Sequence, residues 1–253
     1  MTPFVYEAVG DAFIPSKLAR SPWARDKQNG VAMGGLLVHL LEQMPLDVPM
    51  TMARLTIDIL AAAPWSATMG QTRIVRAGKR IRLAEAELLV EGAVVARATA
   101  LYVRIAETPV HLAPSLYPSA EKAGSQPFEG IPSFLGTVEA ISVHGSMRER
   151  GPATAWVRFN HEHIAGIPLS PLVRAATLAD FSSGMSHDFD RPAWNFPNLD
   201  IVIHFIRAPE GEWMLMDARS ESAGNGTGLA GAVLADTRGK FARSYQTLFV
   251  SPL

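Results

Sequence analysis

The chain has 253 residues, 48% of them hydrophobic and 19% charged, so it can form one large domain or two of ordinary size and lacks the composition of a disordered protein. Its net charge of -1 provides no basic field for a nucleic-acid backbone, and the absence of cysteine excludes disulfides, thiolate catalysis and Cys-ligated metals. We therefore expect a folded protein that does not bind nucleic acid.

The N-terminal stretch MTPFVYEAVGDAF contains two acidic residues and lacks the basic start and apolar run of a signal peptide. No apolar run reaches the length of about 20 residues that a membrane-spanning helix needs. These features predict a cytoplasmic protein without a membrane span.

The first half of the chain predicts one helix followed by strands. Apolar side chains recur at helical spacing in MGGLLVHLLEQM, residues 33–44, which indicates a buried helix. Alternation in LTIDILAAAP, residues 55–64, predicts a strand, and residues 73–104 read as two strands joined at Glu91-Gly92. The apolar face switches between Leu83 and Ala84, which predicts a β-bulge in the first of these two strands.

The second half repeats this order after a Pro-, Ser- and Gly-rich connection, residues 107–134. A helix is predicted in SPLVRAATLADFSSG, with Ser170 as its N-cap, Pro171 at the first helical position and Gly184 ending it. A strand at residues 198–207 and a hairpin of two strands at residues 231–250 follow. The motif GTGLAG, residues 226–231, fits a dinucleotide-binding pattern but leads into a strand rather than a helix, so we read it as a hairpin bend.

The two halves have the same layout. Aligning Val103 with Val250 gives an offset of 147 (250 minus 103), which also carries Gly92 onto Gly239 and Thr99 onto Gln246. Each half reads as strand, helix and an antiparallel meander, and a largely apolar helix must be wrapped by its sheet to bury its faces. The sequence therefore predicts two similar α+β modules joined by one connection.

The sequence resembles the thioesterase-like superfamily of double-hotdog proteins, and is similar to bacterial acyl-CoA thioesterase II. The resemblance rests on the motifs Gly34-Gly35, RAGKRI, AWVRF, LADFSSG, NLDIVIHFIRAPEGEW and GTGLAGAVLADTRGKFARSYQTLFV. It implies an N-terminal hotdog at 1–106, a linker at 107–134 and a C-terminal hotdog at 135–253. It further implies that the two helix-wrapped antiparallel sheets join into one continuous sheet, with acyl-CoA bound between the two helices.

Asp180 is the first candidate catalytic residue. An anion in the last turn of a helix opposes the macrodipole, at a cost of about 0.3–1 kcal/mol, and such a local conflict often marks function. A partly buried carboxylate there could deprotonate a water that attacks a thioester carbonyl. A solvated carboxylate at a helix end is the alternative.

Two polar residues begin the strand at residues 198–207. Asn198 is a candidate catalytic residue that holds the water or the thioester oxygen, and Asp200 is a candidate substrate-binding residue. Both could instead form turn hydrogen bonds after Pro197. In the acyl-CoA thioesterase II pattern a Thr stands at the position of Asn198, and the catalytic Asp falls nearer Ser183 than Asp180.

Gln246 lies among apolar residues in the final strand, where a buried amide would need partners. It matches the catalytic Gln of the family, which implies that it orients the water or the carboxylate; a sheet-edge Gln facing solvent is the alternative. Ser183 is a further substrate-binding candidate. Gly34 and Gly35 would let a ligand approach free N–H groups at a helix start, unless they serve helix packing instead.

We expect an acyl-CoA thioesterase in which water is activated by Asp180 and positioned by Asn198 and Gln246. No cofactor is expected, and no metal, because His161 and His163 have no third ligand beside them in a known motif. A homo-oligomer, dimer or larger, could form through sheet edges. Two alternatives stay open: a non-catalytic acyl-CoA or lipid-binding protein, and a hotdog CoA-linked hydratase, for which no clear Asp and His pair is found.

Overall fold

The computed structural model describes residues 2–21, 24–112, 117–124, 126–127, 136–190 and 193–253. The chain divides into two compact units. The first contains Met1–Thr108 and Asn160–Thr177, and the second contains Pro109–Phe159 and Leu178–Leu253. The predicted boundaries at 106 and 134 stay a prediction, and residues 113–116, 125 and 128–134 of the predicted connection lie outside the described part.

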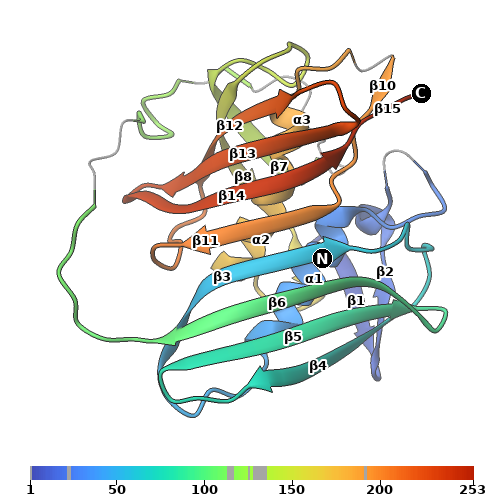
Figure 1. The fold of residues 1–253 in the computed structure, drawn as a ribbon, viewed down its shortest axis with the longest axis vertical. Helices are drawn as coiled ribbons and strands as arrows, with labels where there is room; N and C mark the ends of the chain where they lie inside the picture. The colour runs from blue at the N-terminus through green and yellow to red at the C-terminus, as the bar shows by residue number, and fades with distance from the viewer. Residues whose placement is uncertain (1, 22–23, 113–116, 125, 128–135, 191–192) are drawn as a thin grey trace. The chain divides into compact units, whose positions relative to one another are not determined.

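The first unit is a sheet of strands in the order β3-β6-β5-β4-β2-β1-β9 (Figure 1). Neighbouring strands are antiparallel, except that β1 and β9 are parallel. The bounds are β1 Phe4–Val9, β2 Ala12–Pro15, β3 Met50–Ile59, β4 Thr68–Arg76, β5 Ile81–Val90, β6 Ala93–Arg104 and β9 Glu162–Ile164, with a short 3-10 helix at Lys17–Ala19.

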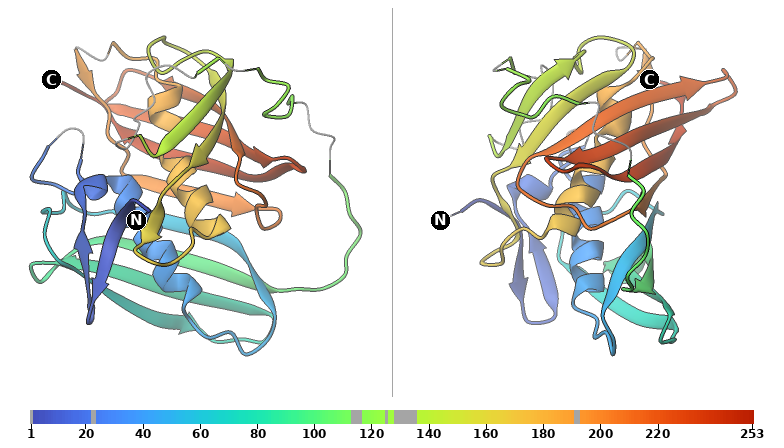
Figure 2. Two further views of the ribbon diagram at one scale, coloured as in Figure 1. Left: turned by 180° about the vertical axis from the view of Figure 1, so that it is seen from behind. Right: turned by 90° about the vertical axis from the view of Figure 1, so that its left-hand side faces the viewer.

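Helix α1, Gly30–Glu42, packs against β4, β5 and β6, as Figure 2 shows from behind the sheet. Asn29 caps it, because the Asn29 side chain accepts a hydrogen bond from the Ala32 N–H at 2.6 Å. Most of the helix is buried, which confirms the predicted apolar helix. The sheet supplies small side chains beneath it, since Ala84, Ala86, Ala98 and Ala100 are all buried.

The second unit is an antiparallel sheet in the order β7-β8-β12-β13-β14-β11. Its bounds are β7 Val138–His144, β8 Ala153–Phe159, β11 Asp200–Phe205, β12 Met214–Ser222, β13 Thr227–Asp236 and β14 Gly239–Phe249. Two short strands, β10 Trp194–Asn195 and β15 Ser251–Pro252, pair with each other. The described residues 117–124 pack on this sheet, since Ala120 and Tyr117 contact the cluster around Trp156.

Helix α2 spans Pro171–Asp180, and the division between the two units falls within it. Ser170 caps it as predicted, because its hydroxyl accepts from the Val173 N–H at 3.0 Å, and Pro171 is the first helical residue. The prediction that Gly184 ends this helix was wrong. The helix breaks at Phe181, and a separate short helix, α3 Ser182–Met185, contains Gly184.

The two long hairpins correct two further predictions. Strand β5 pairs with β6 without a shift from Ile81 to Leu88; the irregularity nearby lies on β4, between Ile74 and Arg76. The predicted bulge between Leu83 and Ala84 was therefore wrong, and Arg82 rather than Leu83 continues the buried face.

The offset of 147 was wrong by one residue. Gly92 is the second residue of a two-residue turn between Val90 and Ala93, whereas Gly239 begins the returning strand and pairs with Asp236. Ladder positions therefore match at an offset of 146: Ala84 pairs with Ala100, and Ala230 with Gln246 (246 minus 100). Because a one-residue slip moves a side chain to the other face, Gln246 corresponds to buried Ala100 and not to Thr99.

No helix in the described part of the chain is both long enough and apolar enough to span a bilayer.

Candidate functional site

Asp180 is the last residue of α2 and is partly exposed. Its Oδ1 accepts a hydrogen bond of 2.8 Å from Asn198 Nδ2. Burial among protein atoms raises the pKa of the Asp180 carboxyl to about 6, while the hydrogen bond from Asn198 acts in the opposite direction. Asp180 is therefore a carboxylate that is ionised near neutral pH yet more basic than an ordinary aspartate.

Asn198 precedes β11 and is held against β14. Its backbone forms an isolated antiparallel bridge with Leu248. Asp200 points to a different partner: its carboxylate accepts from the Thr247 N–H at 2.7 Å and from the Thr247 hydroxyl at 3.0 Å. The structure thus brings Asn198 to Asp180 and ties Asp200 to the sheet, which favours the structural alternative for Asp200.

Gln246 is fully buried on the inward face of β14, so the solvent-facing alternative was wrong. Its Nε2 donates to the Ala179 carbonyl at 2.9 Å, and its Oε1 accepts from the Ser183 N–H at 3.2 Å. The amide therefore bridges the break between α2 and α3 and satisfies one backbone group on each side. Asp180 lies in the segment between these two contacts.

Helix α3 is hydrogen-bonded at both ends to side chains of the sheet, and these side chains lie in one row across neighbouring strands. Its first turn is held by the Ser183 N–H on Gln246, and Ser186 at its end shares a 2.8 Å hydrogen bond with Ser220 on β12. Ser220 and Gln246 both pair with Ala230 on β13, so the row is polar at both sides and small in the middle. Ser183 enters the site through its backbone.

Gly34 and Gly35 lie in the second turn of α1, which begins at Gly30, so their expected position at the helix start was wrong. A Cβ on Gly35 would lie 2.1 Å from His163 Cε1, whereas on Gly34 it would lie 3.4 Å from Ile57. His163 Nε2 is 2.9 Å from the Ala32 carbonyl, and burial lowers the pKa of this imidazole to about 3. Close packing against His163 accounts for Gly35.

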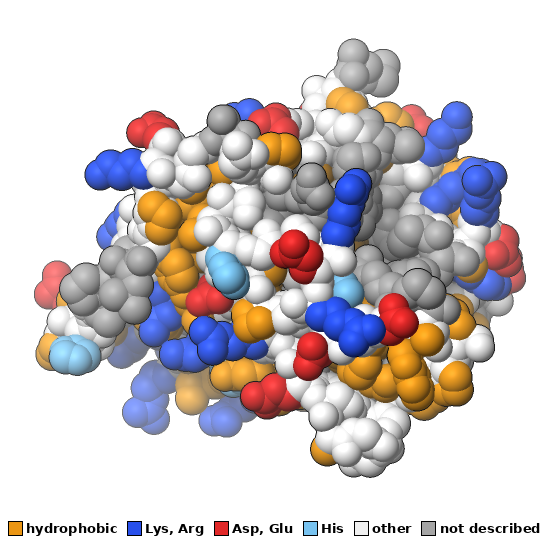
Figure 3. Space-filling model, turned by 90° about the horizontal axis from the view of Figure 1, so that it is seen from above, with side chains coloured by type: hydrophobic (Ala, Val, Ile, Leu, Met, Phe, Trp, Pro, Cys, Tyr) orange, Lys and Arg blue, Asp and Glu red, His pale blue; other side chains and the backbone are white. Residues whose placement is uncertain are grey.

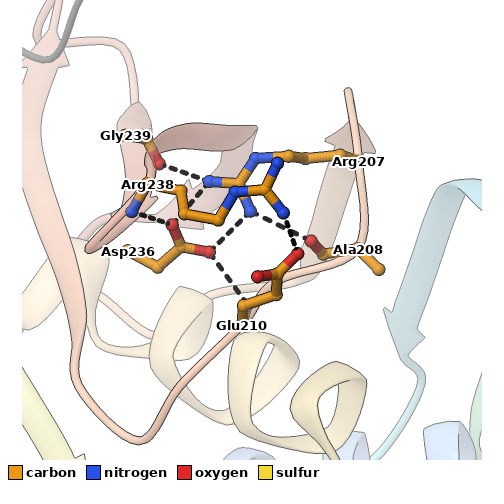
Figure 4. Close-up of polar contacts among 6 residues, drawn as sticks. All are labelled: Arg207, Ala208, Glu210, Asp236, Arg238 and Gly239. Carbon is orange, nitrogen blue, oxygen red and sulfur yellow. Dashed lines mark hydrogen bonds and ion pairs between the residues drawn. The ribbon is translucent and has the colours of Figure 1, made fainter.

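A buried ion-pair cluster in the second unit was missed by sequence analysis (Figure 4). Asp236, whose side chain is 0% exposed, accepts hydrogen bonds from Nη1 and Nη2 of the Arg207 guanidinium. It also accepts the Glu210 and Arg238 backbone N–H groups, each at 2.8 Å. The Asp236 contacts raise the pKa of Arg207. The only sequence signal was the charged pattern of RAPEGEW and LADTRGK, which resembles ordinary exposed turns.

Other charged groups are dispersed. Figure 3 shows side chains of both charges on the described part of the face drawn. Within the described ranges, no three His, Cys, Asp or Glu side chains are grouped so that they could hold a metal ion. His161 and His163 are both buried in the first unit.

The helix break was also missed, because LADFSSG continues the helical pattern without interruption. The break leaves a carboxylate of raised pKa beside an amide donor and above a buried glutamine. Such a group can accept a proton from water and requires no nucleophilic side chain.

Comparison with protein families gives two matches. Residues 19–103 match the acyl-CoA thioesterase N-terminal domain, and residues 109–250 match the acyl-CoA thioesterase C-terminal domain. A search of curated protein sequences found no match.

Three solved structures illustrate the likeness in fold. A hot dog fold protein of unknown function from Alicyclobacillus acidocaldarius has 15% identity and a TM-score of 0.75, covering 97% of this chain and 95% of the other. A candidate thioesterase from Novosphingobium aromaticivorans has 18% identity and a TM-score of 0.72, covering 97% and 98%. Acyl-CoA thioesterase II TesB2 from Mycobacterium marinum has 15% identity and a TM-score of 0.68, covering 98% and 96%. The predicted α+β double-hotdog fold is confirmed.

Proposed function

Because the chain belongs to the acyl-CoA thioesterase family, we propose that it hydrolyses an acyl-CoA thioester to a free carboxylic acid and CoA, with Asp180 as the general base. The observation that carries this proposal is the hydrogen-bonded pair of Asp180 and Asn198 at the helix break, with the raised pKa of the Asp180 carboxyl. A base is most effective when its pKa lies near the working pH.

In the proposed reaction, the Asp180 carboxylate takes a proton from water as the water oxygen attacks the thioester carbonyl carbon. The tetrahedral intermediate then collapses, the carbon–sulfur bond breaks, and the CoA sulfur takes the proton from Asp180, so that CoA leaves as a thiol and the carboxylate is restored. Asn198 holds the carboxylate through Oδ1, which leaves Oδ2 for the water. Gln246 acts through the backbone on both sides of Asp180, so it is a positioning residue in this mechanism.

The test is release of free thiol from a panel of acyl-CoA substrates of different chain length. Asp180→Asn is expected to lower kcat by about 10²-fold or more, the usual contribution of a general base. Gln246→Ala is expected to lower kcat with a smaller change in KM. Asp58→Asn makes the same chemical change in an exposed ion pair with Arg97 and should leave turnover unchanged.

Undiminished turnover in both Asp180→Asn and Gln246→Ala would overturn the residue assignment. Tight binding of every acyl-CoA tested without turnover by the wild-type protein would instead support the alternative of a non-catalytic binding protein.

A further inference from the structure

Two buried hydroxyl groups lie beside Gln246 without a hydrogen-bond partner among the described protein atoms. They are Ser244 Oγ on β14 and Ser182 Oγ at the start of α3, and both residues are 0% exposed. A buried hydroxyl without a partner is costly, so native proteins satisfy such groups through water or a ligand. The neighbours of Ser244 across the sheet, Ile203 and Ala232, have apolar side chains and cannot serve.

The first unit shows that the fold does not need these groups. At the offset of 146, Ser244 and Gln246 correspond to Ala98 and Ala100, which pair with Ala86 and Ala84. The same hairpin thus forms with alanine at both places. The polar pair belongs to the second unit only, where the helix above it is broken.

The Ser244 hydroxyl lies on the side of Gln246 away from Asn198. Along β14, Asn198 is bridged to Leu248, two residues beyond Gln246, whereas Ser244 is two residues before it. Ser182 directly precedes Ser183, whose backbone N–H donates to Gln246 Oε1, so Ser182 lies at the α3 side of the glutamine. Residues two apart on a strand have Cα atoms about 7 Å apart. A water molecule can therefore lie between the side chains of Ser244 and Gln246 and bond to both.

The Gln246 amide has capacity for a further contact. It has two N–H groups and two acceptor sites, of which one N–H and one acceptor site are used by Ala179 and Ser183. A buried water molecule needs two to four polar partners, and Ser244, Ser182 and Gln246 provide three.

We propose that Ser182 and Ser244 form a buried water site with Gln246, and that this site makes both serines positioning residues for the reaction at Asp180. A hydrogen bond from this water fixes the orientation of the Gln246 amide. The amide in turn bonds to Ala179 and Ser183 and so fixes the backbone on both sides of Asp180. This inference rests on the proposed function for its effect on rate, but the water site itself does not depend on it.

The experiment compares Ser244→Ala and Ser182→Ala with the wild-type protein. Ser244→Ala should fold, because alanine occupies the matching place at Ala98. Each variant is expected to lower kcat about tenfold, the rate equivalent of one lost hydrogen bond, with KM nearly unchanged. The acidic limb of the kcat profile should shift, which loss of stability alone would not cause. The matched control Ala98→Ser adds a hydroxyl in the first unit and should leave kcat unchanged.

A crystal structure of the wild-type protein at a resolution that shows ordered water provides the independent readout. The proposal expects one water bonded to both serine hydroxyls and absent in Ser244→Ala. It is overturned if the hydroxyls bond to backbone carbonyls instead, or if both alanine variants keep the wild-type kcat and pH profile. If the wild-type protein shows no turnover but contains the water, the proposed function fails while the water site stands.

Discussion

Asp180 combines two conditions that rarely meet in one carboxylate. It lies in the last turn of α2, where the helix macrodipole disfavours an anion, and protein atoms around it shield it in part from water and raise its pKa. The hydrogen bond from Asn198 offsets part of this cost. A charged Asp180 is therefore a source of instability that we expect the protein to retain for its reactivity.

The activity should depend on pH through Asp180. Since the base form is required, kcat/KM is expected to fall as the pH drops through about 6. Asn198→Ala removes the hydrogen bond that lowers this pKa, so the acidic limb should move to higher pH. Thiol release measured between pH 4.5 and 8 for the wild-type protein and for Asn198→Ala gives the position of the acidic limb in each. An unchanged limb in Asn198→Ala would contradict this role.

The substitution Asp180→Asn, which should lower the activity, is expected to raise the stability of the fold. The folded-state pKa of about 6 lies above the ordinary value of 3.8, so the folded protein binds the proton more tightly than the unfolded chain. The resulting cost is absent below the unfolded value and fully present above about pH 6. Asp180→Asn should therefore raise the free energy of unfolding at pH 7, by an amount on the order of 1 to 3 kcal/mol, and change it less at pH 4. Urea denaturation at both pH values tests this; a loss of stability at pH 7 would count against it.

Sequence analysis brought Asp180, Asn198 and Gln246 together, because each is a polar residue in an apolar or conflicting context. It could not separate Asp200 from them, since Asp200 shares a strand with Asn198 and differs only in its partner, Thr247. Whether a polar side chain faces a neighbouring backbone or a reactive space depends on atoms distant in sequence.

At the scale of elements, the second turn of α1 lies so close to β9 that it restricts the size of the side chain allowed at position 35. His163 on β9 packs where a Gly35 side chain would lie, and it also contacts the Ala32 carbonyl. Gly34, one residue earlier, faces Ile57 at an ordinary contact distance. The two adjacent glycines therefore have different structural requirements.

Gly35→Ala is expected to lower the free energy of unfolding by about 1 to 3 kcal/mol, because the added methyl group overpacks the core against the His163 ring. Gly34→Ala is the matched control and should be neutral or stabilising by up to about 1 kcal/mol, since alanine favours a helix. Denaturant titration of both variants measures the difference. Equal effects would show that His163 moves away at little cost.

Helices and strands followed from periodicity, but their breaks and registers did not. The pattern of LADFSSG continues through Phe181, and the break there is held by Gln246 from a strand more than 60 residues later. The turn glycines suggested an offset of 147, yet Gly92 and Gly239 occupy different turn positions. A turn can place its glycine at more than one position, so glycine alone does not define the register of a hairpin.

At the scale of the whole molecule, the second unit has a stabilising cluster with no counterpart among the described side chains at the matching turn of the first. Asp236 occupies the ladder position that Val90 has in the first hairpin (90 plus 146), and it binds Arg207 with both carboxylate oxygens. This joins the chain reversal after β11 to the β13–β14 turn.

Asp236→Ala should lower the free energy of unfolding by about 3 to 5 kcal/mol, because it removes the carboxylate that neutralises the Arg207 guanidinium and that accepts from two backbone N–H groups. Glu210→Gln removes an exposed ion pair with Arg238 in the same cluster and should change it by less than about 1 kcal/mol. Thermal and urea unfolding give both values. A similar small effect in the two variants would show that water replaces Asp236 readily.

By itself the sequence determined the two-module α+β plan and the positions of both principal helices, because periodicity and caps act over a few neighbouring residues; Asp180, Asn198 and Gln246 were named as candidates with the help of the family resemblance. Only the tertiary structure decided that residues 160–177 group with the first unit, that Gln246 spans a helix break, and that Ser182 and Ser244 lie buried beside it. These features depend on strand register and on contacts between segments far apart in the chain. A change of one residue in register reverses which side chains are buried, and local patterns cannot specify that change.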